Sequence, residues 1–266
     1  MIYSLPLTLL DNLTGVMGRI EAAAHRAGRD PSRVELVAVT KTAAPSAIGE
    51  LASSGRIRHL GESRVQDGQA KRRALEGRLP PLTWRMIGHL QRNKARAALE
   101  TFDTIDSLDS IALAETLHKQ LAETGRTLPV LVQVKLTERE TQGGISPQAV
   151  DEFLEKLKAF DRLSPRGLMA IAPTADPVEA VRPHFRRMRE LFEKSFPGGG
   201  ILSMGMSGDF EIAVEEGASM VRVGSVLFDR MQRFYAGSNT YASGSLKRGE
   251  SSPAGTGRES SSEATE

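Results

Sequence analysis

The chain has 266 residues, 39% of them hydrophobic and 26% charged, a composition typical of a soluble globular protein with a buried core. Its 35 Lys and Arg residues against 33 Asp and Glu leave a net charge of only +2, which gives little support to nucleic-acid binding. No cysteine is present, which excludes disulfides, thiolate metal sites and cysteine nucleophiles.

The first predicted element is a helix. Residues 1–10 are apolar but carry no basic group, and Asp11 and Asn12 interrupt the run. We therefore predict neither a secretion signal nor a membrane span, and we expect a cytoplasmic protein. Apolar residues recur at helical spacing, which predicts an amphipathic helix over residues 8–27 that ends at Gly28.

After this helix, short apolar runs alternate with helical patterns. The predicted strands are 34–40, 57–60, 84–88, 102–106, 129–136, 166–171, 201–204 and 219–223. The predicted helices that follow them are 44–54, 65–76, 92–99, 109–124, 147–160, 178–195 and 209–217, with a last one after Ser225. This order predicts an α/β protein, a single (β/α)8 TIM-like barrel over residues 1–236 that includes the extra N-terminal helix. An open doubly wound sheet is the alternative, but its usual glycine-rich phosphate loop is absent after the first strand.

The C-terminal segment, residues 237–266, has a different composition. Of its 30 residues, 13 are Ser or Gly, and Leu246 is its only aliphatic residue larger than alanine. Such a segment buries too little apolar surface to offset the entropy of ordering it. We therefore predict a disordered tail.

Lys41 follows the first predicted strand, and in a parallel barrel the functional groups gather where the strands end. An amine at the end of a buried strand is costly to keep charged, and a neutral amine attacks carbonyl groups, as in Schiff-base lysines. The alternative is a lysine whose charged end reaches solvent.

Ser207 and Gly224-Ser225 lie in turns after the last two predicted strands, each before a helix. Hydroxyl and free N–H groups at such positions bind phosphate, and barrels commonly hold phosphate at these two loops. Ordinary turn and helix-cap chemistry is the alternative. Combined with Lys41, these turns indicate a ligand that carries both an aldehyde and a phosphate, and pyridoxal 5′-phosphate fits.

The motifs at these strand ends resemble the pyridoxal phosphate homeostasis protein family, whose fold is related to the N-terminal barrel of alanine racemase. The resemblance covers residues 8–235 with its motifs in order. They are Val39-Thr40-Lys41-Thr42, Gly61-Glu62 with Val65-Gln66, Ile87-Gly88-His89-Leu90-Gln91 with Asn93-Lys94, Gly167-Leu168-Met169-Ala170-Ile171, Leu202-Ser203-Met204-Gly205-Met206-Ser207-Gly208-Asp209 and Met220-Val221-Arg222-Val223-Gly224.

The resemblance implies a role for each residue of the predicted site. Lys41 would hold the cofactor as a Schiff base, and Arg222 would face the pyridine nitrogen. The phosphate would be received by Ser207, Gly224 and Ser225. The pocket would be lined by Ser63, His89 and Met204.

The chain departs from the family pattern at several positions. Ser225 stands where the family usually has threonine, and Ser63 stands where it usually has asparagine. After the fifth strand the family usually has Val-Asn and later a lysine before a small residue and glycine. Here the chain has Val134-Lys135 and Gln142-Gly143-Gly144. Lys135 and Gln142 are therefore the positions at which cofactor release could differ.

The resemblance favours a carrier rather than an enzyme. Arginine keeps its proton, so a pyridine nitrogen that faces Arg222 stays unprotonated and the ring is a weaker electron sink. Racemases of this type use a tyrosine as second base, and the three tyrosines here, Tyr3, Tyr235 and Tyr241, lie at no predicted strand end. We expect a non-catalytic monomer without metal that delivers the cofactor to apoenzymes dependent on it. The alternatives are an amino-acid racemase or decarboxylase of the alanine racemase fold type, and a Schiff-base aldolase.

Overall fold

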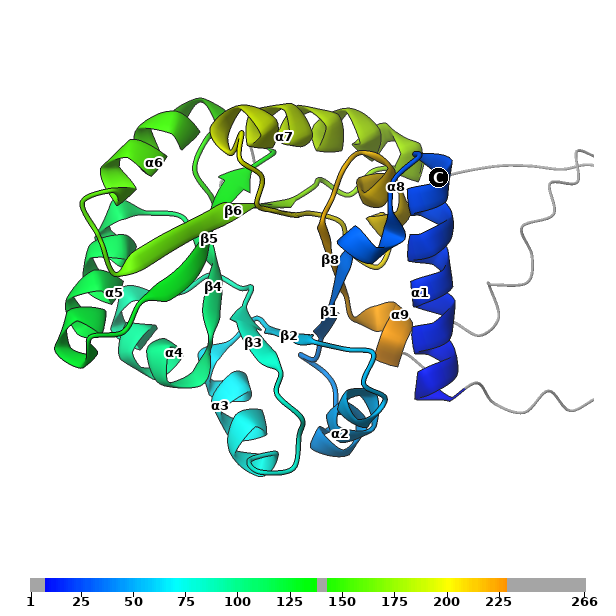
Figure 1. Ribbon diagram of the computed structural model, residues 1–266, viewed down its shortest axis with the longest axis horizontal. Helices are drawn as coiled ribbons and strands as arrows, with labels where there is room; N and C mark the ends of the chain where they lie inside the picture. The colour runs from blue at the N-terminus through cyan, green and yellow to red at the C-terminus, as the bar shows by residue number, and fades with distance from the viewer. Residues whose placement is uncertain (1–7, 138–142, 229–266) are drawn as a thin grey trace, which may run out of the picture. The chain divides into compact units, whose positions relative to one another are not determined.

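The computed structural model describes residues 8–137 and 143–228, which form one closed barrel of parallel strands (Figure 1). Each strand pairs with the next along the chain, and β1 pairs with β8 to close the ring. The strands are β1 (Glu35–Val39), β2 (His59–Glu62), β3 (Thr83–Met86), β4 (Thr104–Leu108), β5 (Leu128–Lys135), β6 (Leu163–Ile171), β7 (Ile201–Ser203) and β8 (Met220–Val223). The predicted TIM-like barrel is confirmed.

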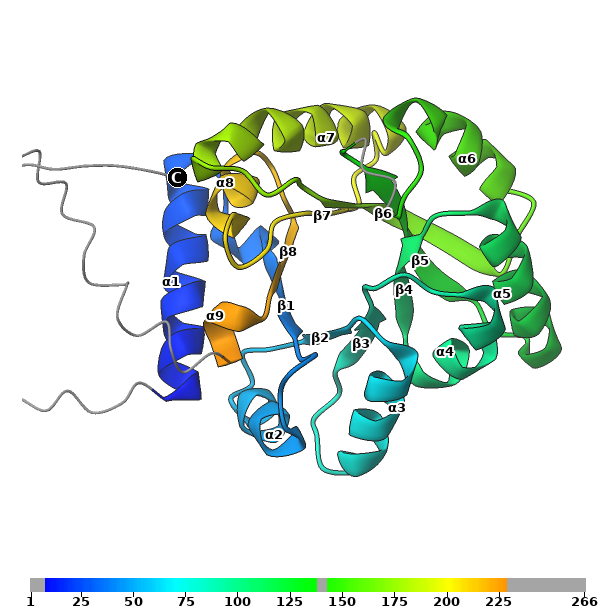
Figure 2. The ribbon, with the colours of Figure 1, turned by 180° about the vertical axis from the view of Figure 1, so that it is seen from behind.

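Helices surround the ring on its outside, as the view from behind shows (Figure 2). The α-helices are α1 (Leu9–Arg26), α2 (Pro45–Ser53), α3 (Val65–Ala74), α4 (Ala95–Thr101), α5 (Ile111–Thr124), α6 (Val150–Leu157), α7 (Arg182–Ser195), α8 (Phe210–Glu215) and α9 (Ser225–Phe228). Short 3-10 helices are η1 (Pro31–Arg33), η2 (Arg92–Lys94), η3 (Pro147–Ala149) and η4 (Val178–Val181). None of the described helices is long and apolar enough to cross a membrane.

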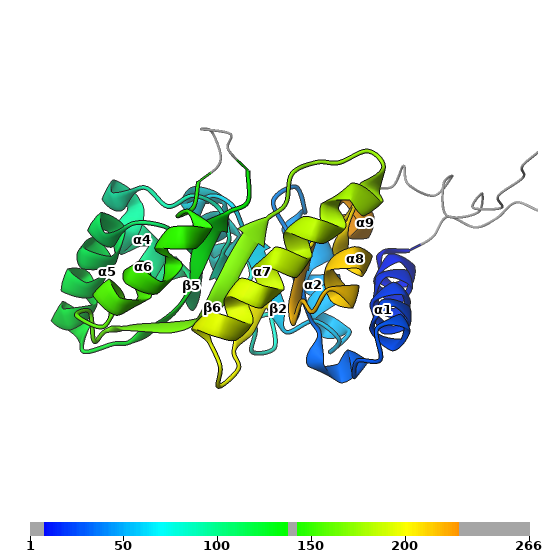
Figure 3. The same cartoon turned by 90° about the horizontal axis from the view of Figure 1, so that it is seen from above.

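The predicted N-terminal helix is confirmed as α1. Thr8 caps it, because its hydroxyl accepts a hydrogen bond from the Asp11 N–H while the Asp11 side chain accepts from the Thr8 N–H. Its apolar side, which includes Leu13 and Ile20, is buried. The helix packs against α8 and α9, so it covers the barrel where the last strand meets the first (Figure 3).

The two faces of the strands carry different side chains, because successive residues of a strand point to opposite sides. Leu36 and Ala38 belong to the hydrophobic core shared with the helices. Val37 instead faces Gly61 inside the barrel, where a Cβ on Gly61 would lie 2.8 Å from the Val37 side chain. Arg85 and Arg222 align with these interior residues, since Gly61 pairs with Arg85 and Val37 pairs with Arg222. The barrel interior is therefore partly polar.

Several strand boundaries differ from the prediction by two residues or more. β3 ends two residues earlier than expected, at Met86, and β6 begins three residues earlier, at Leu163. β2 begins and ends two residues later than expected, so Gly61 and Glu62 belong to the strand rather than to the loop after it. β4 is displaced in the same direction, so Ser107 and Leu108 join Asp106 inside the strand. Glu62 and Asp106 both lie in the barrel wall, where Lys71 and Arg85 are their respective charged partners. The helix after β4 also begins later than expected, capped by the Ser110 hydroxyl.

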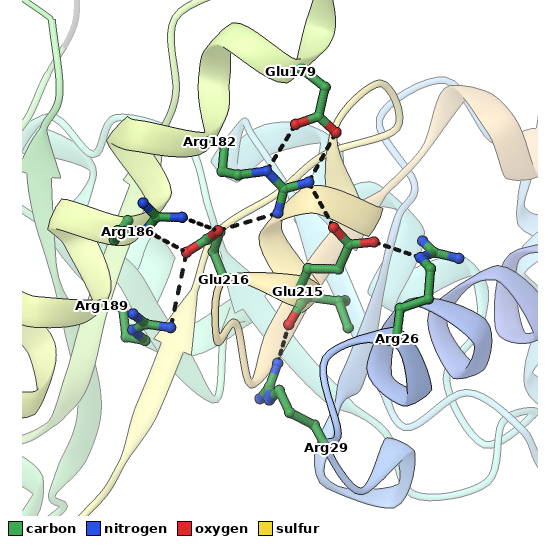
Figure 4. A network of polar contacts seen from close by, with 9 residues as sticks. Arg26, Arg29, Glu179, Arg182, Arg186, Arg189, Glu215 and Glu216 are labelled. Atoms are coloured by element: carbon green, nitrogen blue, oxygen red, sulfur yellow. Dashed lines mark hydrogen bonds and ion pairs between the residues drawn. The ribbon is translucent and has the colours of Figure 1, made fainter.

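A network of arginines and glutamates joins α1, η4 and α7 to the end of α8 (Figure 4). Glu215 accepts hydrogen bonds from Arg26 Nε and Arg182 Nη2, both at 2.7 Å. Glu216, which is buried, accepts from Arg182 Nη1 at 3.2 Å and from Arg186 Nη2 at 3.1 Å. We call these groups the Glu215–Glu216 network.

The described residues, 8–137 and 143–228, belong to the barrel and its surrounding helices. The ends of the predicted barrel domain, residues 1–236, fall outside the described residues, so its limits stay a prediction. The predicted disordered tail, residues 237–266, lies outside the described residues and stays a prediction.

Candidate functional site

The ends of β7, β8 and β1 bring most of the predicted site together. These three strands are neighbours in the ring. The Gly224 N–H, directly after β8, donates a hydrogen bond to Ser207 Oγ at 3.2 Å, which ties the loops after β7 and β8 to each other. Gly224 also abuts the end of β1, since a Cβ on it would lie 3.0 Å from the Val39 carbonyl oxygen. Lys41 follows Val39 by two residues. We call Lys41, Ser207, Gly224 and Ser225 the mouth cluster.

Lys41 lies in a turn outside the strand. β1 ends at Val39, and the Ala43 N–H donates to the Thr40 carbonyl oxygen at 2.8 Å, which closes a turn that contains Lys41. The Lys41 side chain is exposed. The expectation that burial at the strand end makes its charge costly is therefore wrong, because the chain has left the strand before it reaches this residue. Its reaction with an aldehyde stays a prediction.

The turn after β7 is held by hydrogen bonds of Ser207 and Asp209. Ser207 Oγ already accepts a hydrogen bond from Gly224, so its own proton remains to be donated. Asp209 Oδ1 accepts from the Met206 N–H at 2.6 Å and fixes the turn. Burial raises the pKa of Asp209, although this hydrogen bond and the nearby Arg222 oppose the shift. Ser225 is exposed at the first position of α9.

Gly205 shows why this turn needs glycine. Its φ of +92° is in the left-handed region, and a Cβ there would lie 2.5 Å from the Ala213 Cβ. The turn therefore packs directly against α8, and this contact holds Ser207 close to the end of β8.

Arg222 is buried inside the barrel below the mouth cluster. Its guanidinium donates to Ser203 Oγ at 2.9 Å and to the Ala170 carbonyl oxygen at 2.8 Å. Burial lowers the pKa of Arg222 to about 10, against the opposing charges of Asp106 and Asp209. The group therefore stays protonated at neutral pH, and two hydrogen bonds fix its orientation.

The sequence did not single out Arg85, which is the second buried arginine of the barrel. Its Nε and Nη2 donate to the two carboxylate oxygens of Asp106 at 2.7 and 2.9 Å, a bidentate pair between β3 and β4. Thr104 Oγ1 donates to the same carboxylate at 2.8 Å. An arginine between Trp84 and Met86 in an apolar strand is the one signal that could have pointed to this pair.

Ser63 and His89 lie in the loops after β2 and β3. A Cβ on Gly88 would lie 2.2 Å from the Ser63 carbonyl oxygen, so the two loops touch and only glycine fits between them. His89 is exposed, with its Nδ1 3.4 Å from Asp109 Oδ2. Within the described part of the chain, no hydrogen bond or ion pair joins either residue to the mouth cluster, and their pocket-lining roles stay predictions.

Met204 and the loop after β5 differ from the rest of the predicted site. Met204 is fully buried in the hydrophobic core shared with the helices, so its side chain offers no open surface to a ligand. Lys135 is the half-buried last residue of β5. Gln142 lies outside the described residues. Among residues 8–137 and 143–228, no group of three His, Asp or Glu side chains could hold a metal ion.

Comparison with known proteins gives a consistent result. The family model described as the N-terminal domain of alanine racemase matches residues 16–230. Pyridoxal phosphate homeostasis proteins from Pseudomonas aeruginosa and Aquifex aeolicus are 38% and 37% identical to the chain, each over 222 residues. The matches cover 83% and 82% of this chain and 95% and 96% of those relatives, respectively.

A solved structure extends this likeness to the fold. The structure of PipY from Synechococcus elongatus with pyridoxal phosphate bound is 38% identical in sequence and superimposes with a TM-score of 0.68. The match covers 79% of this chain and 99% of PipY.

Proposed function

Because this chain belongs to the pyridoxal phosphate homeostasis protein family, we propose that it binds pyridoxal 5′-phosphate and takes part in the homeostasis of that cofactor. The observation that carries the proposal is the mouth cluster. It joins an exposed amine to a hydroxyl and a glycine at the ends of three neighbouring strands. An amine for the aldehyde and a tight polar turn for the phosphate are the two features this ligand needs.

Each residue of the proposed site contributes a separate interaction. Lys41 Nζ supplies the amine for covalent attachment, and its exposure leaves it free to react. The Ser207 hydroxyl donates a hydrogen bond to a phosphate oxygen, and Ser225 supplies a second hydroxyl. Gly224 leaves room beside Val39 that a side chain would fill. Arg222 directs a fixed positive charge at the pyridine nitrogen. The bound cofactor supplies an aldehyde that can be passed to another amine.

We propose a carrier rather than an enzyme. The names of the relatives support this role, and the charge on Arg222 keeps the pyridine nitrogen without a proton, which disfavours carbanion chemistry. The alternative, an amino-acid racemase or decarboxylase, needs a second base. Tyr3, Tyr235 and Tyr241 all lie outside the described residues. Transfer to apoenzymes, a monomeric state and a cytoplasmic location remain our expectations.

The proposal is tested by the absorption spectrum of the purified protein with added pyridoxal phosphate, before and after borohydride reduction. We expect a visible band that reduction removes, and a single modified peptide that contains Lys41. Turnover of alanine or serine enantiomers is measured on the same sample. A spectrum identical to that of free cofactor would refute binding, and turnover far above that of free cofactor would refute the carrier role.

A further inference from the structure

A buried cluster lies directly beneath the turn that carries Lys41. Glu62, the last residue of β2, is fully buried, and its Oε1 accepts from Lys71 Nζ at 2.6 Å. The same oxygen accepts a hydrogen bond from the Thr40 hydroxyl. Lys71 Nζ also donates to the Thr40 carbonyl oxygen. One ammonium and one carboxylate therefore hold both the side chain and the backbone of the residue before Lys41.

These contacts fix the start of the Lys41 turn. The Thr40 N–H donates to the Gly61 carbonyl oxygen at 3.0 Å, and the Thr40 carbonyl oxygen accepts from the Ala43 N–H as well as from Lys71. Thr40 is thus restrained by β2 on one side and by α3 on the other. Lys41, the next residue, has an exposed side chain, and its direction depends on how firmly this backbone is held.

The helix that supplies Lys71 is itself held close to its neighbours. A Cβ on Gly68 would lie 2.6 Å from the Phe102 ring, so α3 approaches the C-terminal end of α4 as closely as glycine permits. One turn further, Arg72 donates to the Thr101 carbonyl oxygen and to Asp103 Oδ1. The helix that carries Lys71 is therefore held in place, and so is the position from which Lys71 contacts Thr40.

A contribution to stability alone does not account for the buried ion pair between Lys71 and Glu62. Removing two charges from water is costly, and well-packed apolar residues of similar size often serve a core equally well. The pair also leaves Glu62 Oε2 buried without a hydrogen-bond partner in the described part of the chain. Both members of the pair instead form hydrogen bonds with Thr40, the residue beside the proposed covalent site.

We propose that Lys71 and Glu62 are positioning residues, which fix the Thr40 backbone so that the Lys41 amine meets the aldehyde of a cofactor held by its phosphate. This inference rests on the proposed function. Neither residue needs to touch the cofactor, because the effect passes through Thr40. Small displacements of reacting groups reduce rates strongly, so loss of the pair should slow covalent attachment without weakening phosphate binding.

The test uses Lys71→Met in the full-length protein, with Arg73→Met on the exposed side of the same helix as the matched control. We expect the attachment of pyridoxal phosphate to Lys41, fixed by borohydride and counted by peptide mass spectrometry, to slow about tenfold or more. Affinity for pyridoxine 5′-phosphate, which has no aldehyde, should change less than twofold. Reductive alkylation of Lys41 by propanal should also be unchanged. Lys71→Arg should restore most of the attachment rate.

A further variant and the unmodified protein distinguish failure of the positioning role from failure of the proposed function. Lys71→Met leaves a buried carboxylate unpaired, so the double variant Glu62→Gln/Lys71→Met is measured as well, and we expect it to fold better while attachment remains slow. Full recovery of attachment in the double variant, or equal loss of pyridoxine 5′-phosphate affinity, would overturn the positioning role. If the unmodified protein forms no adduct at Lys41, the proposed function fails instead.

Discussion

The Glu215–Glu216 network and the mouth cluster use polar residues in opposite ways. In the network, Glu215 accepts hydrogen bonds from Arg26 of α1 and Arg182 of α7, and Glu216 accepts them from Arg182 and Arg186, both of α7. In the mouth cluster, Lys41 and Ser225 are exposed, and within residues 8–137 and 143–228 neither side chain forms a hydrogen bond or an ion pair. Paired charges hold helices against the barrel, whereas groups without partners are free for a ligand. We therefore expect substitutions in the network to reduce stability and substitutions at the mouth to reduce binding.

The largest effect should come from Lys41→Ala. The variant removes the amine, so we expect complete loss of the visible band and of the borohydride-fixed adduct. Because the side chain is exposed, the melting temperature should change little. Absorbance and calorimetry on the same samples check both expectations. A retained adduct would place covalent attachment at a different residue.

Arg222→Gln should reduce both stability and cofactor binding, because Arg222 is buried like Glu216 of the network yet belongs to the proposed site. Loss of its two hydrogen bonds should cost about 1–2 kcal/mol of unfolding free energy. Cofactor affinity should fall about tenfold, or about 1.4 kcal/mol, and the visible band should shift. Denaturant titration and spectroscopic titration measure the two effects. An unchanged band would show that Arg222 does not face the ring.

Glu216→Gln should lower stability and leave cofactor affinity unchanged. Burial opposes ionisation of Glu216, but hydrogen bonds from Arg186 and Arg182 outweigh it and hold its pKa below the usual value. Because the arginines are partly exposed, we expect a loss of about 1–2 kcal/mol at neutral pH. Urea unfolding measures the loss. Weaker cofactor binding at unchanged stability would contradict the view that the network serves stability and the mouth cluster serves binding.

The same variant predicts a pH dependence. A carboxylate whose pKa is lowered by folding stabilises the protein above its unfolded pKa of about 4.3, and this contribution disappears as pH falls through the lower folded value. The stability difference between the native protein and Glu216→Gln should therefore be constant near neutral pH and shrink below about pH 4.3. A difference that stays constant down to pH 3 would mean that the carboxylate charge is not responsible.

The smallest effect should come from Ser225→Thr, which restores the residue usual in the family. Both side chains carry a hydroxyl, so we expect cofactor affinity to change less than about threefold, or below about 0.7 kcal/mol. Ser225→Ala serves as the comparison and should weaken binding about threefold to tenfold, as expected for one lost hydrogen bond. Equal affinity of all three proteins would remove Ser225 from the proposed phosphate site.

The barrel was predictable because its signals are local. Alternating apolar strands and helical patterns identify every strand and most helix boundaries, and the rule that function gathers at strand ends singled out Lys41, Ser207 and Gly224. The boundaries of β2 and β4 were wrong because they depend on non-local pairs. Arg85 meets Asp106 across 21 residues of sequence, and no pattern within either strand specifies that contact. The same applies to Lys71 and Glu62, which meet only when α3 packs against the barrel.

Ring closure between β1 and β8 also has a consequence for protein synthesis. Lys41 is made early, whereas Arg222, Gly224 and Ser225 leave the ribosome more than 180 residues later. A nascent or truncated chain that ends before Arg222 lacks residues proposed to receive the phosphate and to face the ring. On the proposed function, site-specific loading of Lys41 with pyridoxal phosphate therefore requires translation of the whole barrel.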